Sequence, residues 1–70
     1  MRLMDIRRRL AANIIRLRKE RGWSQEELAD RAGLHRTYIS GVERGVRNPT
    51  ITVVAKIAEA LGVDVALIFD

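Results

Sequence analysis

Side chains suited to recognising another molecule are concentrated between residues 35 and 48. Arg36 could donate two hydrogen bonds to the O6 and N7 atoms of a guanine, and Thr37 could hydrogen-bond a base or place its methyl group on a thymine. The hydroxyls of Tyr38 and Ser40 could reach a base edge or a phosphate. These groups could therefore contact nucleic acid, provided that the fold presents them outward. The candidate base-reading residues are therefore Arg36, Thr37, Tyr38 and Ser40.

The sequence does not indicate catalytic or metal chemistry. It has no cysteine and one histidine, His35, and its carboxylates are scattered. Cysteine-based zinc, haem or iron–sulfur sites are therefore excluded, and a single histidine is a poor start for another metal site. A nucleophile paired with a base and a glycine-rich phosphate loop are also missing. We expect a protein that is not an enzyme and that uses no metal or cofactor.

Charge is distributed unevenly along the chain. The sequence has 13 Lys+Arg and 9 Asp+Glu, which gives a net charge of +4. Residues 1–47 hold 12 basic and 6 acidic residues (+6), whereas residues 48–70 hold one basic and three acidic residues (−2). Eleven of the 13 basic residues are arginine, whose planar fork suits phosphate and guanine. The basic part predicts a nucleic-acid partner, and the acidic, apolar end suggests a second role.

The 70 residues are enough for a single domain, residues 1–70. A domain of about 60 residues buries only about 60% of its unfolded surface. Small folds without disulfides or metals often gain stability by oligomerising, so we expect a partner chain. No apolar run approaches the roughly 18–20 residues of a membrane-spanning helix, and no signal peptide is recognisable. We therefore expect a cytoplasmic protein with no membrane partner.

The hydrophobic pattern predicts an all-α fold of five helices. Apolar residues recur at the helical period. Ser24 and Glu27 form a capping box, and Asp5 and Asp64 are candidate caps for the first and last helices. The expected helices cover about residues 6–21, 25–31, 35–44 and 65–69, with a fourth helix that begins after a cap at Thr50 or Thr52 and ends near Leu61. The expected core positions are Ile6, Leu10, Ile14, Leu17, Leu28, Ala29, Ile39, Val42, Val54, Ile57, Ala58 and Leu61.

The second and third helices are predicted to form a helix-turn-helix, because about three residues that include a glycine join two short helices. Ala29 is small enough for the third helix to cross closely above it, and Ile39 and Val42 can lock that helix onto its neighbours. Gly33 is expected to have a positive φ, at a point where a side chain would obstruct the turn. In such motifs the second helix enters the major groove of DNA. Residues 35–44 are therefore the expected recognition helix.

Residues 14–69 resemble the helix-turn-helix (XRE) family of the phage Cro and C1 repressors. The resemblance rests on Arg18-Lys19-Glu20-Arg21-Gly22, Ser24-Gln25-Glu26-Glu27-Leu28-Ala29, Tyr38-Ile39-Ser40-Gly41-Val42-Glu43-Arg44-Gly45, Arg47-Asn48-Pro49 and Leu61-Gly62-Val63. Within the family, residues 36–40 look most like the controller proteins of restriction–modification systems. The resemblance implies a five-helix, lambda-repressor-like DNA-binding domain, a homodimer and operator binding. Other members of the family are domains of larger repressors and antitoxins.

The resemblance also implies which residues hold the DNA backbone. Gln25 would contact a phosphate and brace the recognition helix. The loop after that helix would hold further phosphates through Arg44, Arg47 and Asn48. His35 could cap the recognition helix or touch a phosphate. The apolar C-terminal end would form a two-fold dimer interface through Val63, Val65, Leu67, Ile68 and Phe69, and the alternative is that it simply covers the core.

Several positions also have a purely structural interpretation. Arg36 could be a solvated surface residue, and Tyr38 could pack against the second helix. Arg44 could pair with Glu43 or Glu20. Gly41 costs a helix roughly 1 kcal/mol relative to alanine, and either close approach of DNA or tight packing would explain its presence.

Together these features predict a homodimeric transcriptional regulator that binds a pseudo-palindromic operator. Its two recognition helices would lie in successive major grooves about 34–36 Å apart. Repression would follow from blocking RNA polymerase. Activation would instead need an acidic surface that touches polymerase, such as the region of Glu43. The alternative is a protein-interaction or antitoxin-type module that binds DNA only weakly.

Overall fold

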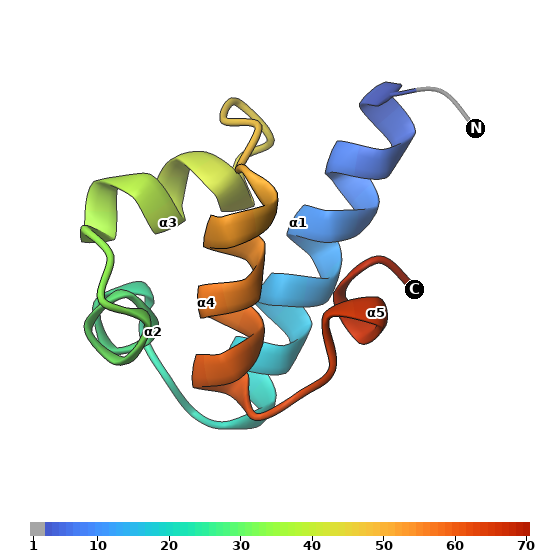
Figure 1. Ribbon diagram of the computed structural model, residues 1–70. Helices are drawn as coiled ribbons and strands as arrows, with labels where there is room; N and C mark the ends of the chain where they lie inside the picture. Colours follow the sequence, from blue (N-terminus) through green and yellow to red (C-terminus); the bar gives the residue numbers. More distant parts are fainter. Residues whose placement is uncertain (1–2) are drawn as a thin grey trace.

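The computed structural model describes the backbone from residue 3 to residue 70 and the side chains from residue 6 onward. The described residues form five α-helices and no strand, which confirms the predicted fold class (Figure 1). The helices are α1 (Leu3–Glu20), α2 (Gln25–Ala32), α3 (Arg36–Glu43), α4 (Ile51–Leu61) and α5 (Val65–Ile68). Because α1 begins at Leu3, Asp5 lies inside the helix and is not its cap. His35, Arg44 and Phe69 are caps of their helices rather than helical residues.

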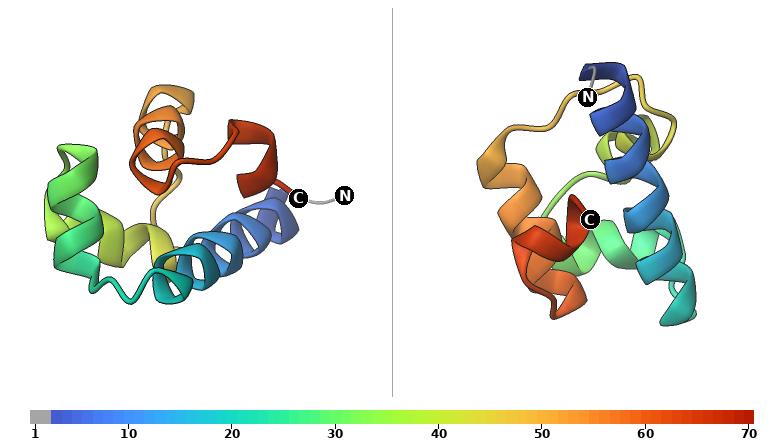
Figure 2. Two further views of the ribbon diagram at one scale, coloured as in Figure 1. Left: turned by 90° about the horizontal axis from the view of Figure 1, so that it is seen from below. Right: turned by 90° about the vertical axis from the view of Figure 1, so that its right-hand side faces the viewer.

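Each helix packs against two others. Helix α2 contacts both α3 and α4, while α1 contacts α3 and α5, and α5 also contacts α4. Figure 2 shows the α2–α3 pair on one side of α4 and the short α5 on the other. The helix-turn-helix therefore forms one side of the molecule and the C-terminal helix forms another.

Side-chain caps define where the helices begin. The Ser24 hydroxyl accepts a hydrogen bond from the Glu27 N–H at 3.0 Å, and the Asp64 carboxylate accepts one from the Ala66 N–H at 3.0 Å. Each such cap contributes about 1 kcal/mol. In a complete capping box the Glu27 carboxylate would also accept a hydrogen bond from the Ser24 N–H. Among the described residues that carboxylate instead pairs with Arg31 at 2.6 Å, so only the bond to the Ser24 hydroxyl forms.

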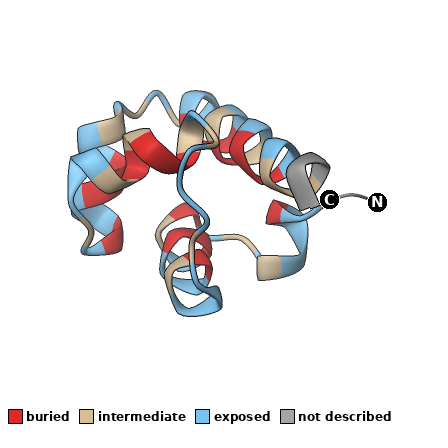
Figure 3. Cartoon of the chain, turned by 90° about the horizontal axis from the view of Figure 1, so that it is seen from above, coloured by how far each residue is buried: buried red, intermediate tan, exposed pale blue. Residues whose placement is uncertain are grey.

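The inward faces of the helices form one hydrophobic core (Figure 3). Each large apolar side chain buried there contributes about 1.5–3 kcal/mol. All but one of the predicted core positions are buried; the exception is Ile6, which is only half-buried. The core consists of Leu10, Ile14, Leu17, Leu28, Ala29, Ala32, Ile39, Val42, Val54, Ile57, Ala58, Leu61 and Ile68.

Ile68 belongs to this core, which corrects one prediction. Its side chain is fully buried within the monomer, so it offers no surface to a second chain and does not belong in a dimer interface. The Asn13 amide donates to the Ile68 carbonyl at 2.7 Å and ties α5 to α1. Arg21 similarly donates to the Leu61 carbonyl at 3.0 Å and ties α1 to the end of α4. These bonds satisfy carbonyls that a helix end leaves without partners.

Gly33 ends α2 in the left-handed conformation, with φ 69°. The expected positive φ is therefore confirmed. A Cβ atom built on Gly33 would meet no atom within 4 Å, so the expectation that a side chain would obstruct the turn is wrong. The turn needs glycine because other L-residues, apart from asparagine and aspartate, rarely adopt that conformation.

Candidate nucleic-acid interface

Helix α3 has one side in the core and one side in solvent. Ile39 and Val42 are buried on the inner side, and Gly41 is also buried. Arg36 and Thr37, at the N-terminal end of the helix, are exposed. Tyr38 and Ser40 are half-buried, and Tyr38 packs against the edge of the core. The structure thus brings the four candidate base-reading residues onto one short helix whose opposite side is fixed by packing.

Arg36 extends away from the protein. Its side chain is 65% exposed, and Glu26 of α2 lies 4.0 Å away with an even more exposed side chain. An ion pair at this distance in solvent contributes little to the stability of the fold. The Arg36 guanidinium therefore keeps its hydrogen-bond donors available for another molecule.

His35 caps the recognition helix. Its Nδ1 atom accepts a hydrogen bond from the Thr37 N–H at 3.1 Å. This confirms the capping interpretation of the histidine. In a neutral ring, Nδ1 as the acceptor leaves the proton on Nε2, so the exposed histidine keeps one donor.

A buried polar network joins the first three helices. Arg18 binds the Glu43 carboxylate with Nε at 2.7 Å and Nη2 at 3.0 Å, and a third donor, Nη1, reaches the Trp23 carbonyl at 2.7 Å. The Gln25 amide donates to the same carboxylate at 2.9 Å. Only 11% of the Arg18 side chain and 4% of the Glu43 side chain are exposed. The network therefore fixes Gln25 relative to the end of α3.

The network corrects two expectations for Glu43. Its carboxylate is buried and already paired, so it cannot form part of an acidic surface for RNA polymerase. Its partner is Arg18 rather than Arg44, whose Nε atom donates to the Ser40 carbonyl at 3.3 Å. No local pattern predicts the Arg18–Glu43 pair, because the two residues lie 25 positions apart.

The N-terminus of α2 borders a surface hollow of about 440 Å³. Arg18, Ser24, Gln25, Glu26 and Arg36 line it. Free backbone N–H groups at a helix N-terminus favour an anion such as phosphate. Gln25 contributes a second amide hydrogen that the bond to Glu43 does not use.

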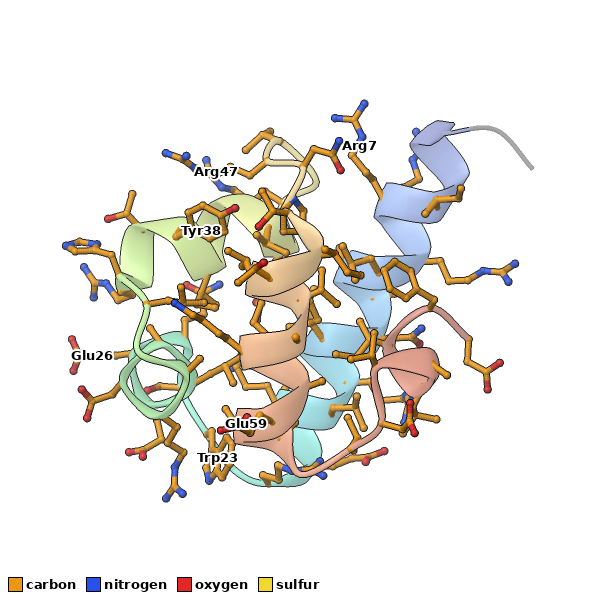
Figure 4. The ribbon with its side chains drawn as sticks, in the orientation of Figure 1. Arg7, Trp23, Glu26, Tyr38, Arg47 and Glu59 are labelled. Atoms are coloured by element: carbon orange, nitrogen blue, oxygen red, sulfur yellow. The ribbon has the colours of Figure 1, made fainter. Side chains whose placement is uncertain are left out.

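The loop after α3 lies beside the recognition helix. Arg44, Arg47 and Asn48 are exposed there. The Arg47 guanidinium lies over the Tyr38 ring, with its central carbon 5.1 Å from the ring centre. Figure 4 places Tyr38 and Arg47 along one edge of the molecule, opposite Trp23. The candidate phosphate and base contacts from the loop and from α3 thus share an edge.

Exposed apolar side chains occur in two places. Leu67 and Phe69 at the C-terminal end are 37% and 39% exposed. Val63 and Val65 are half-buried and pack against the core. Val46 and Ile51, which no pattern in the sequence marks as exposed, are 65% and 68% exposed.

The described residues contain no group of three or more histidine or acidic side chains placed to hold a metal ion. No helix among them is long and apolar enough to cross a membrane.

A helix-turn-helix carried by a five-helix bundle, with arginine and hydroxyl groups on the exposed side of its second helix, defines a DNA-binding transcriptional regulator. The helix-turn-helix family HTH_3 matches residues 14–68, and the chain belongs to this family. The family comprises non-enzymatic DNA-binding regulators, among them repressors and controller proteins.

Three similar proteins illustrate the relationship. The uncharacterized HTH-type transcriptional regulator y4dJ of Sinorhizobium fredii is 47% identical over 60 residues, which cover 86% of this chain and 78% of that protein. The crystal structure of the hypothetical transcription factor NHTF from Neisseria has a TM-score of 0.91 at 45% identity, covering 93% of this chain and 75% of that one. The restriction–modification controller protein C.AhdI from Aeromonas hydrophila has a TM-score of 0.87 at 38% identity, covering 90% and 96%. The expected resemblance to controller proteins is confirmed.

Proposed function

We propose that this transcriptional regulator is a homodimer that binds a pseudo-palindromic operator in the cytoplasm, with α3 in the major groove. The observation that carries the proposal is the exposure of Arg36 and Thr37 at the N-terminal end of α3, while Ile39 and Val42 fix the other side of the helix in the core. A recognition helix needs both features, since its base contacts depend on a fixed orientation.

Base reading is assigned to the outward side chains of α3. Arg36 would bind a guanine through O6 and N7, a contact that discriminates by about 1–3 kcal/mol. Thr37 would contact the neighbouring base. Tyr38 and Ser40 lie further along the helix and would add hydroxyl contacts. These contacts supply sequence selectivity.

Phosphate contacts would surround the recognition helix and set its register. Gln25 and His35 each keep one donor after making their contacts within the chain. Near Gln25, the backbone N–H groups at the N-terminus of α2 border the surface hollow and would also favour a phosphate. From the other end of α3, the loop would contribute Arg44, Arg47 and Asn48.

The dimer would form through the C-terminal end. Leu67 and Phe69 are exposed and apolar, and Val63 and Val65 lie beside them in the sequence with part of their surface free. Burying apolar surface is favourable by about 25 cal/mol per Å². A two-fold axis at this end would give the dimer two α3 helices, one for each half-site.

Selection of binding sites from a random duplex pool at about 150 mM salt tests the proposal. We expect an enriched inverted repeat with half-sites about 10 base pairs apart or a multiple of that distance. An enriched single half-site would contradict the dimer but would still agree with base contacts from α3. If no sequence is enriched and the protein binds DNA only with a salt-sensitive Kd of roughly 10⁻⁴–10⁻⁶ M, sequence-specific binding is contradicted. That result would favour a module whose main partner is another protein.

A further inference from the structure

Gly41 is buried on α3 beneath the side chain of Arg47. A Cβ atom built on Gly41 would lie 2.8 Å from the Arg47 Cγ atom and 3.1 Å from its Cδ atom. Real Cβ atoms do not approach other carbons this closely, so any side chain here would displace Arg47. Gly41 has ordinary helical backbone angles, unlike the four glycines with positive φ. The absent side chain is therefore what matters at this position.

The Gly41 backbone also anchors the loop that carries Arg47. The Gly41 carbonyl accepts hydrogen bonds from the Val46 N–H at 3.0 Å and from the Arg47 N–H at 3.2 Å. These bonds return the chain to the side of α3 directly after the helix ends. The start of the Arg47 side chain is thus held at the surface of Gly41.

Tyr38 holds the other end of the same side chain. Tyr38 and Gly41 are three residues apart on α3 and so lie on one face of the helix. The Arg47 guanidinium carbon lies 5.1 Å from the centre of the Tyr38 ring, within the range of a cation–π contact. The aliphatic part of Arg47 therefore rests on Gly41 and its charged group rests on Tyr38.

We propose that Gly41 is a positioning residue that, together with the Tyr38 ring, sets the direction of Arg47 before DNA binds. The inference rests on the proposed DNA binding and makes Tyr38 and Arg47 one pre-oriented unit. Arginine loses much rotational freedom when it is immobilised, so a side chain that is already oriented binds more tightly. Close approach of DNA is not needed to explain Gly41, because Arg47 occupies the space that its side chain would take.

The first test measures the free protein by NMR. Protons over the face of an aromatic ring resonate upfield, so the Cδ and Nε protons of Arg47 should be shifted upfield in the wild type. Tyr38→Phe keeps the ring and should keep the shift. Tyr38→Leu and Gly41→Ala should each abolish it. Unshifted Arg47 protons in the wild type, or an unchanged shift in folded Gly41→Ala, would overturn the proposal without reference to DNA.

The second test measures affinity for the selected duplex at several salt concentrations. The logarithm of the binding constant decreases linearly with the logarithm of the salt concentration. If each protomer neutralises one phosphate fewer, this slope becomes shallower by about 0.9 per protomer, or about 1.8 per dimer. We expect Arg47→Ala and Gly41→Ala each to lower affinity about tenfold or more and to lower the slope similarly. The double variant should bind no more weakly than Arg47→Ala. Additive losses, or a Gly41→Ala slope equal to that of the wild type, would overturn the proposal.

Two controls separate this role from general damage to the fold. Alanine favours a helix more than glycine does, so Gly41→Ala should melt at the same or a higher temperature. If it unfolds instead, the double variant Gly41→Ala with Arg47→Ala should fold again, because the side chain that would clash is gone. A double variant that stays unfolded would overturn the proposal. Arg31→Ala is the matched control, because Arg31 lies 4.2 Å over the Trp23 ring, away from α3. Wild-type protein that binds no DNA would contradict the proposed function, whereas the NMR result would still decide the role of Gly41.

Discussion

Arg18 and Glu43 form a buried ion pair across 25 residues of sequence, with Nε 2.7 Å from one carboxylate oxygen and Nη2 3.0 Å from the other. The pair joins the end of α1 to the end of α3. Because Gln25 donates to the same carboxylate, the pair also fixes the start of α2. The angle of the helix-turn-helix is therefore held by hydrogen bonds as well as by apolar packing.

Glu43→Gln should destabilise the fold strongly. The substitution leaves the Arg18 charge buried without a counter-charge, which costs about 3–5 kcal/mol in comparable pairs. Urea unfolding followed by circular dichroism measures the loss.

The matched control is Glu20→Gln, which removes an exposed partner of Arg16 at 3.2 Å. Exposed pairs contribute no more than about 1 kcal/mol. If the two variants lost the same free energy of unfolding, the buried pair would not be an important link in the fold.

Arg36→Ala should weaken operator binding and relax selectivity at one base position in each half-site. The expected loss is about 1–3 kcal/mol per half-site, because the side chain would give up two hydrogen bonds to one guanine. Titration against duplexes that carry each of the four base pairs at every position measures both effects. Uniform weakening across all duplexes would instead make Arg36 a phosphate contact.

Leu67→Glu should separate the proposed dimer. A carboxylate in an apolar interface loses its hydration without gaining a partner, which is strongly unfavourable. Sedimentation velocity should show a monomer at concentrations where the wild type is a dimer. Val46→Glu places the same charge on another exposed apolar residue and should leave the dimer intact. A Leu67→Glu protein that still sediments as a dimer would move the interface elsewhere.

Gly33→Ala should lower the free energy of unfolding by about 1–2 kcal/mol, because an alanine would have to adopt a left-handed backbone conformation. Gly33→Asn should cost less, since asparagine tolerates that conformation better. Thermal unfolding of both variants tests the prediction. Equal losses for alanine and asparagine would indicate a steric cause, which the open space around Gly33 does not support.

The sequence is sufficient to predict the helices because their signals are local. The apolar period places Leu10, Ile14 and Leu17 on one stripe, and all three are buried. Thr50, just before the fourth predicted helix, is a residue type suited to a cap, and its hydroxyl accepts from the Val53 N–H at 3.2 Å. Caps and periodicity involve residues a few positions apart, so they can be recognised along the chain.

Long-range partners cannot be predicted in this way. Arg18 and Glu43 each look like exposed helix residues in the sequence, and only the packing of α1 against α3 buries them together. The sequence leaves open whether Ile68 meets a second chain or covers the core, and the fold places it in the core of its own chain.

Gly41 shows most clearly what the sequence predicts by itself and what only the tertiary structure decides. The sequence alone predicts a glycine inside a helix, between the expected core positions Ile39 and Val42, and it leaves the reason open. The tertiary structure decides the reason, because the chain after α3 turns back and lays Arg47 across the glycine. Local patterns determine which segments are helical, whereas the space beside a residue depends on chain segments that only folding brings together.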